Sequence, residues 1–173
     1  MAEEMLDIIN PVTGEVTGQA PRSRCHGDNT LWHRAVHVLV FHPETGDILL
    51  QKRSKTKRIQ PGKWDASVGG HISAGESIAE ALLRETAEEI GLQQQSGDFK
   101  FLFEYEIHNE IESELATVFR LNSAGPFTFP EDEIDELRFF PVEELKQRLA
   151  TGNTADMTPI LQKELAMLDG FKS

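Results

Sequence analysis

Apolar residues alternate with polar ones, or run together, in several short stretches along the chain. β-Branched and aromatic residues are enriched in these stretches, and turn-forming residues such as the PETG at 43–46 separate them. The pattern predicts strands at 33–42, 47–53, 65–71, 100–109, 113–122 and 135–140. Pro, Gly and Thr interrupt residues 7–30, for which we expect a short hairpin that turns at 10–15, followed by a loop.

Helical periodicity predicts three helices between and after these strands. Residues 77–90 begin with the capping-box pair Ser77 and Glu80, and Gly91 is well placed for the left-handed C-terminal position. On a helical wheel of this segment, Ala79, Leu83, Thr86 and Ile90 form the face expected to pack on a sheet. Further helices are expected at 141–150, with Pro in the first turn, and at 158–168, with Thr158 as N-cap.

Strands and helices therefore mix along the chain, which indicates an α/β fold in which helices pack against a mixed sheet. We expect a single domain over 1–173, with the hairpin and loop at 1–30 and a C-terminal helix within 155–173.

Composition and charge exclude several classes of function. The chain has 173 residues and a formal net charge of −12, so its surface repels nucleic acid. It lacks a run of about 20 apolar residues, and its acidic N-terminus is unlike a signal peptide, so we expect a cytoplasmic protein that does not bind membranes. A single cysteine, Cys25, excludes an internal disulfide. A homodimer is a common state for a domain of this size.

Three glutamates of the 77–90 helix fall on one side of it. Glu85, Glu88 and Glu89 are related by three- and four-residue spacings, which makes them neighbours on the helix surface. Like charges so placed repel, which is reasonable where divalent cations lie among them, and oxygen ligands suit Mg²⁺ or Mn²⁺. A solvated acidic face is the alternative for these three residues alone.

The surrounding spacing favours the metal site. The pattern G-x5-E-x7-R-E-x-x-E-E-x-G is matched in full, by Gly70, Glu76, Arg84, Glu85, Glu88, Glu89 and Gly91. This segment resembles the Nudix box, the signature of the Nudix hydrolase superfamily, and the element order resembles the Nudix α/β/α sandwich. Thr86 departs from the motif, since a bulky aliphatic residue usually stands there.

The resemblance implies a role for each matched residue. Glu85, Glu88 and Glu89 would bind Mg or Mn, and one of them would help to deprotonate water. Arg84 and Glu76 would pair and orient that cluster, and Gly70 would permit the bend into the helix. The reaction implied is attack of water on phosphorus in a small-molecule substrate that carries a diphosphate.

A second resemblance extends beyond the box. The run from Ile48 to Ser77 resembles isopentenyl diphosphate isomerases, which share the Nudix fold. Their metal ligands match His26, His33, His71, Glu112 and Glu114, which gives a candidate second metal site of imidazole and carboxylate ligands. Their diphosphate-binding cations match Arg22, Arg53 and Lys57, and an active-site tyrosine matches Tyr105. His37, His42 and His108 have no such match, and we interpret them as structural or exposed.

The departures from the isomerases concern their proton-transfer chemistry. Gly69 stands where those enzymes have a cysteine, and Ile160 lies near the position of a tryptophan that covers the carbocation. The isomerases also have arginine and tyrosine at the positions of Glu85 and Glu88. We therefore expect a metal-dependent diphosphate hydrolase of an isomerase-like subgroup. The alternatives are an isomerase-like enzyme and a non-catalytic diphosphate-binding sensor.

Overall fold

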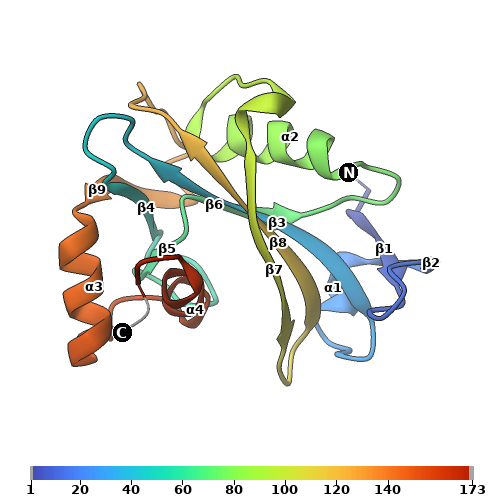
Figure 1. Ribbon diagram of the computed structural model, residues 1–173. Coiled ribbons are helices and arrows are strands. Elements are labelled where there is room, and N and C mark those ends of the chain that lie inside the picture. The colour runs from blue at the N-terminus through green and yellow to red at the C-terminus, as the bar shows by residue number, and fades with distance from the viewer. Residues whose placement is uncertain (1, 172–173) are drawn as a thin grey trace.

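A seven-stranded mixed sheet forms the centre of the protein in the computed structural model, which describes residues 2–171 (Figure 1). Its strands are ordered β5-β4-β3-β8-β7, with β6 paired to β3 and β9 paired to β4. The strand bounds are β3 Trp32–Phe41, β4 Ile48–Arg53, β5 Trp64–Asp65, β6 Val68–His71, β7 Lys100–His108, β8 Ser113–Asn122 and β9 Ile134–Phe140. The predicted strands are confirmed, except that the segment predicted at 65–71 forms two short strands, β5 and β6.

Strand β3 occupies the middle of this sheet and brings distant segments together. One edge pairs in parallel with β8 along its whole length, from Trp32 with Ser113 to Phe41 with Asn122. The other edge pairs antiparallel with β6, from Ala35 with His71 to Val38 with Val68, and beyond that with β4. The ends of β6 and β8 that carry His71 and Glu114 therefore lie beside the start of β3.

Alternation along β3 separates two cores on the two faces of the sheet. Val36, Val38 and Val40 pack toward α2 (Ile78–Ile90). Leu39 and Phe41 pack toward α3 (Val142–Thr151) and α4 (Pro159–Met167) on the other face. Figure 1 shows these helices on opposite sides of the sheet. The predicted α/β/α sandwich with a mixed sheet is confirmed.

Helix α2 begins and ends as its sequence predicts. The Ser77 hydroxyl accepts from the backbone N–H of Glu80, and the Glu80 carboxylate accepts from the backbone N–H of Ser77. Gly91 ends the helix with φ of 70°, in the left-handed region. The predicted packing face was wrong in part, because Ala79 is exposed and the buried residues are Ala81, Leu82, Thr86 and Ile90.

The N-terminal segment forms a separate two-stranded sheet, β1 (Met5–Ile9) with β2 (Val16–Pro21), which confirms the predicted hairpin. A four-residue helix, α1 (Arg22–Cys25), follows where a loop was expected, and His26 caps it. A 3₁₀ turn, η1 (Ser96–Asp98), precedes β7. Within residues 2–171, the helices are all too short or too polar to cross a membrane.

Candidate functional site

The charged residues of the box form one hydrogen-bonded network around Arg84. Its Nε and Nη2 donate to the two oxygens of Glu76, at 2.7 and 2.8 Å. Its Nη1 donates to Glu85 at 2.7 Å and, over 3.4 Å, to Glu88. The Arg84 Nη2 also donates to the His71 carbonyl at 3.1 Å, so the helix is tied to β6. The arginine thus holds three carboxylates in place.

Two consecutive glycines of β6 allow the glutamates to approach the strand. A Cβ on Gly70 would lie 2.2 Å from the Glu85 carboxyl carbon, so a side chain at this position would displace Glu85. The backbone N–H of Gly69 donates to Glu89 Oε2 at 2.8 Å, and Gln51 Nε2 donates to Glu89 Oε1 at 3.4 Å. The close approach, rather than a bend, is therefore what requires glycine at position 70.

The three glutamates differ in their surroundings. Burial, and then the charge of Glu85, raises the pKa of Glu89 to about 8. Burial also raises the pKa of Glu85, against the pull of Arg84. The Glu88 side chain is 60% exposed, whereas that of Glu85 is 12% exposed. A buried carboxylate with a raised pKa beside a second carboxylate is a common feature of cation and proton-transfer sites.

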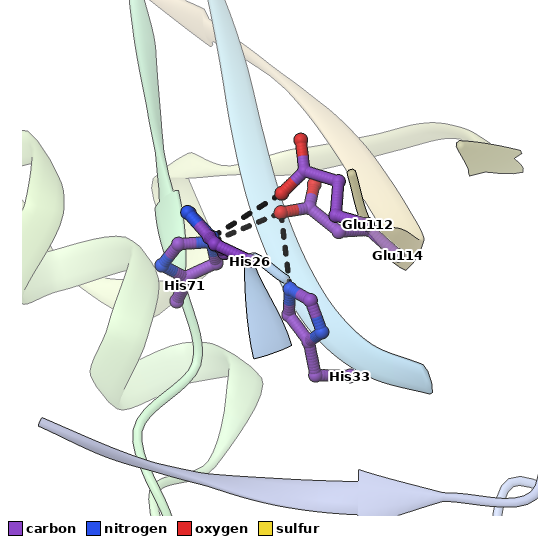
Figure 2. Close-up of side chains that lie close together, drawn as sticks. All are labelled: His26, His33, His71, Glu112 and Glu114. Atoms are coloured by element: carbon purple, nitrogen blue, oxygen red, sulfur yellow. Dashed lines mark hydrogen bonds and ion pairs between the residues drawn. The ribbon is translucent and has the colours of Figure 1, made fainter. Parts of the chain in front are cut away.

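A second cluster lies across β6 from the glutamates and gathers the five residues His26, His33, His71, Glu112 and Glu114 (Figure 2). One ligand atom of each lies within 4.8 Å of all the others. The Nε2 atoms of His26 and His71 are 3.2 Å apart, and Glu114 Oε1 lies 2.9 Å from His71 Nε2 and 3.2 Å from His33 Nε2. Glu112 Oε2 lies 3.2 Å from His26 Nε2.

Sheet register explains why these five residues meet. Glu114 of β8 is paired directly with His33 of β3, and His71 of β6 is paired with Ala35, the next residue of β3 on the same face. His26 at the end of α1 and Glu112 just before β8 complete the cluster. The His33 Nδ1 lies 3.2 Å from the Leu31 carbonyl, a contact that fixes the ring with Nε2 facing inward.

The five groups differ in the protonation state that their surroundings favour, and His26 and Glu114 are held in the forms that ligate a metal. Burial, and then the charges of His71 and Arg22, lowers the pKa of His26 to about 4, so this imidazole is neutral at pH 7. Burial also favours neutral His33, but the hydrogen bond and charge of Glu114 outweigh burial and raise its pKa. Burial, and then Glu114, raises the pKa of Glu112 to about 7. Hydrogen bonds from His33 and His71 overcome burial and lower the pKa of Glu114.

The three predicted phosphate-binding cations lie near one another, and two of them form ion pairs with carboxylates of the protein. The charges of Arg53 and Arg22 contribute, after burial, to a lowered pKa of Lys57, so the three lie within electrostatic range of one another. Arg53 Nη1 is 3.3 Å from Asp65 Oδ2, and Lys57 forms an ion pair with Glu133. Ion pairs within the protein therefore engage Arg53 and Lys57.

Tyr105 belongs to a buried group that the sequence did not reveal. Its hydroxyl donates to Glu164 Oε1 at 2.9 Å, and the same oxygen forms an ion pair with His37 Nδ1. His37 was interpreted as structural or exposed, and it is buried. The available signal was its four-residue separation from His33, which places both on one face of β3. No sequence pattern pointed to Glu164.

Comparison with known proteins agrees with this architecture. The NUDIX domain model matches residues 31–162. The chain is 33% identical to the uncharacterized Nudix hydrolase YfcD of Escherichia coli over 168 residues, which cover 95% of this chain and 86% of that protein. It is 36% identical to Nudix hydrolase 3 of Arabidopsis thaliana over 167 residues, but it spans only 21% of that longer protein.

A solved structure shares the fold over nearly the whole chain. The crystal structure of DR0079 from Deinococcus radiodurans superposes with a TM-score of 0.69 and 25% identity. The superposition covers 94% of this chain and 99% of the DR0079 chain. The family model, the relatives and the box residues around Arg84 agree, and the chain therefore belongs to the Nudix hydrolases.

Proposed function

We propose that this protein hydrolyses a diphosphate linkage in a small molecule with the help of a divalent cation. The observation that carries the proposal is the complete box network, in which Arg84 holds Glu76, Glu85 and Glu88 while Gly69 holds Glu89. The residues fit a hard cation such as Mg²⁺ or Mn²⁺, because they offer several carboxylate oxygens beside one another. When bound, such a cation polarises phosphate and lowers the pKa of water.

The glutamates have distinct expected roles. Glu85 and Glu89 lie closest to β6 and would form the inner part of the cation site, and exposed Glu88 would complete it from the solvent side. Glu89 is the best candidate for the base, since its raised pKa of about 8 lies near working pH. Arg84 and Glu76 would keep the carboxylates in place without contacting the substrate.

The His/Glu cluster is a candidate second metal centre. Three imidazole nitrogens and two carboxylate oxygens suit Mn, Zn or Fe. Ligands at about 2.1 Å from one ion lie at most about 4.2 Å apart, so the spread of 4.8 Å is close to that of a bound set. A metal there would hold a phosphate from the other side of β6.

Hydrolysis is favoured over isomerisation by what surrounds Gly69. Isomerisation needs a group that delivers a proton to the alkene carbon, and Gly69 has no side chain to do so. A Cβ at Gly69 would lie 3.1 Å from the His37 ring, so this imidazole occupies the neighbouring space. Substrate recognition beyond the diphosphate would come from the segments at 23–33 and 107–114.

A panel of nucleoside and prenyl diphosphates, assayed for phosphate and monophosphate release with Mg²⁺ and with Mn²⁺, tests the proposal. Turnover of at least one compound is expected. Deuterium incorporation from D₂O into isopentenyl diphosphate without phosphate release would show an isomerase instead. Tight calorimetric binding without turnover of any compound would show a sensor, and both outcomes would refute the hydrolase.

Removal of one ligand tests the second centre separately. Glu114→Gln should lower the bound transition-metal content, measured by elemental analysis after purification, and should reduce the rise in Tm that added Zn²⁺ produces. Glu110→Gln, a change of an exposed neighbouring acid, is the matched control and should bind metal normally. Equal metal content in the two variants would exclude this centre.

A further inference from the structure

A buried polar group lies on the same sheet face as the His/Glu cluster. It consists of His37, Glu164 and Tyr105, whose side chains meet at Glu164 Oε1. His33 and His37 are four residues apart on β3, with Ala35 between them on the same face. Opposite Ala35 in the register stands Ala116 on one side and His71 on the other. Two small residues, Ala35 and Ala116, thus separate His37 from the His/Glu cluster.

The second nitrogen of His37 is left without a protein partner. Nδ1 is taken by Glu164, and among the described residues Nε2 has no hydrogen bond to protein. In residues 2–171, the fully buried polar side-chain atoms that lack a hydrogen-bond partner are Thr86 Oγ1 and Glu164 Oε2. The His37 Nε2 atom is not one of them, so it is not fully buried. The Nε2 atom lies 3.5 Å from the place of a Cβ on Gly69, so it faces the side of β6 that carries His71.

Charge makes this nitrogen a donor. Burial of the imidazole favours its neutral form, but the charge and hydrogen bond of Glu164 raise the pKa of His37 to about 9. Glu114 and Asp65 add to the negative surroundings, and the neighbouring Tyr105 is neutral because burial and Glu164 raise its pKa. At pH 7 both ring nitrogens carry protons, so Nε2–H is a free charged donor.

We propose that His37 binds substrate directly and donates its Nε2–H to a non-bridging oxygen of the diphosphate. The inference rests on the proposed diphosphate substrate and adds a residue that no motif supplied. Ion pairs within the protein engage Arg53 and Lys57, whereas His37 keeps a charged donor open. Gly69 links the two parts of the site, since its N–H binds Glu89 while its other side adjoins the His37 ring. A diphosphate held by cations at Glu89 would therefore lie near Nε2.

Two amide substitutions separate binding from a structural role. The side-chain amide of His37→Asn reaches the place of Nδ1 and keeps a donor for Glu164, whereas that of His37→Gln reaches the place of Nε2. If His37 binds substrate, His37→Asn should weaken the affinity for methylenediphosphonate in Mg²⁺ by about tenfold or more, and His37→Gln should weaken it less. A purely structural role gives the reverse order, because only His37→Asn retains the contact with Glu164.

Spectroscopy locates the contact without any hydrolysis. In protein labelled with ¹⁵N-histidine, the His37 Nε2 resonance, assigned from its absence in His37→Asn, should shift saturably as methylenediphosphonate is added. His42→Asn, in the turn after β3, is the control and should bind methylenediphosphonate like the wild type. Glu164→Gln should lower the pKa of His37, and the loss of affinity at high pH should then begin at lower pH.

The outcomes distinguish this inference from the proposed function. Saturable binding that leaves the His37 resonance unchanged overturns the inference while hydrolysis stands. Tighter binding by His37→Asn than by His37→Gln does the same. Binding that shifts His37 in a protein without turnover supports the contact and refutes the hydrolase. No binding of methylenediphosphonate at any pH from 6 to about 9 overturns the inference outright.

Discussion

Neutralising Glu89 should stabilise the metal-free protein while removing its activity. Glu89→Gln replaces the carboxylate that burial and Glu85 make unfavourable in its charged form. In the wild type, Glu89 Oε2 accepts from the Gly69 N–H at 2.8 Å, and the amide oxygen of the variant can still accept this hydrogen bond. Its NH₂ group then faces Gln51, which also donates to the Ser67 carbonyl at 3.1 Å, so this second contact is disturbed.

The size and direction of the effect follow from the pKa. Because the folded-state pKa of Glu89 is raised from 4.5 to about 8, its contribution to the stability of the metal-free wild-type protein is fully present below about pH 4.5 and is lost as pH rises to about 8. At about 1.4 kcal/mol per pKa unit, the full cost of the charge above pH 8 is roughly 5 kcal/mol. With about 1 kcal/mol lost at the Gln51 contact, a net gain of about 3–4 kcal/mol is expected for the variant.

Thermal unfolding in EDTA at pH 5 and pH 9 measures this difference. The Tm of Glu89→Gln should exceed that of the wild type by about 6–15 °C at pH 9 and by little at pH 5. Added Mg²⁺ or Mn²⁺ should narrow the gap, because a cation bound to the native wild-type site stabilises it. Diphosphate hydrolysis by the variant should fall by at least ~100-fold.

The matched control is Glu88→Gln, one residue earlier on the same helix and 60% exposed at its side chain. Its Tm in EDTA should stay within about 2 °C of the wild type at both pH values. An equal Tm for Glu89→Gln and wild type at pH 9 would refute the argument from burial. Near-normal hydrolysis by Glu89→Gln would refute the role of Glu89 in the cation site.

Two further changes test packing around the box. Thr86→Val should raise the free energy of unfolding, measured in urea, by about 1 kcal/mol, because Thr86 is fully buried and its Oγ1 lacks a partner among the described residues. Activity should persist. Destabilisation would show that the hydroxyl has a hydrogen-bond partner. Gly70→Ala should reduce hydrolysis by at least ~100-fold because its Cβ would occupy the place of the Glu85 carboxyl. Gly97→Ala, with open space around it, should match the wild type, and normal activity in Gly70→Ala would exclude the crowding argument.

Local sequence signals predicted the elements well because local interactions determine them. The capping pair at Ser77 and the glycine at 91 fix the two ends of α2 within the segment itself. The box residues could be assigned for the same reason, since they lie on one helix and the turn before it. The wheel misplaced Ala79 because the orientation of a helix on a sheet depends on the partner surface, which local periodicity does not contain.

Contacts between residues far apart in the chain could be predicted from the sequence only where a family resemblance supplied them. His26 and Glu112 are far apart in the chain, yet they lie 3.2 Å apart because β8 adds in parallel to β3. The ion pair of His37 with Glu164 spans 127 positions and joins β3 to α4. Such a pair leaves no periodic signal, since its two partners belong to different elements.

Strand β6 lies between the box glutamates and the His/Glu cluster. Successive residues of a strand point to opposite faces, so Gly70 faces Glu85 of α2 while Gly69 and His71 face the other side. The N–H of Gly69 holds Glu89, and the side chain of His71 enters the His/Glu cluster two residues later. With side chains absent at 69 and 70, the strand is thin at this point, and the proposed diphosphate would lie at its edge between the two clusters. The two glycines therefore serve different faces, and replacing either should disturb the site for a different reason: a side chain at Gly70 displaces Glu85, and one at Gly69 crowds His37.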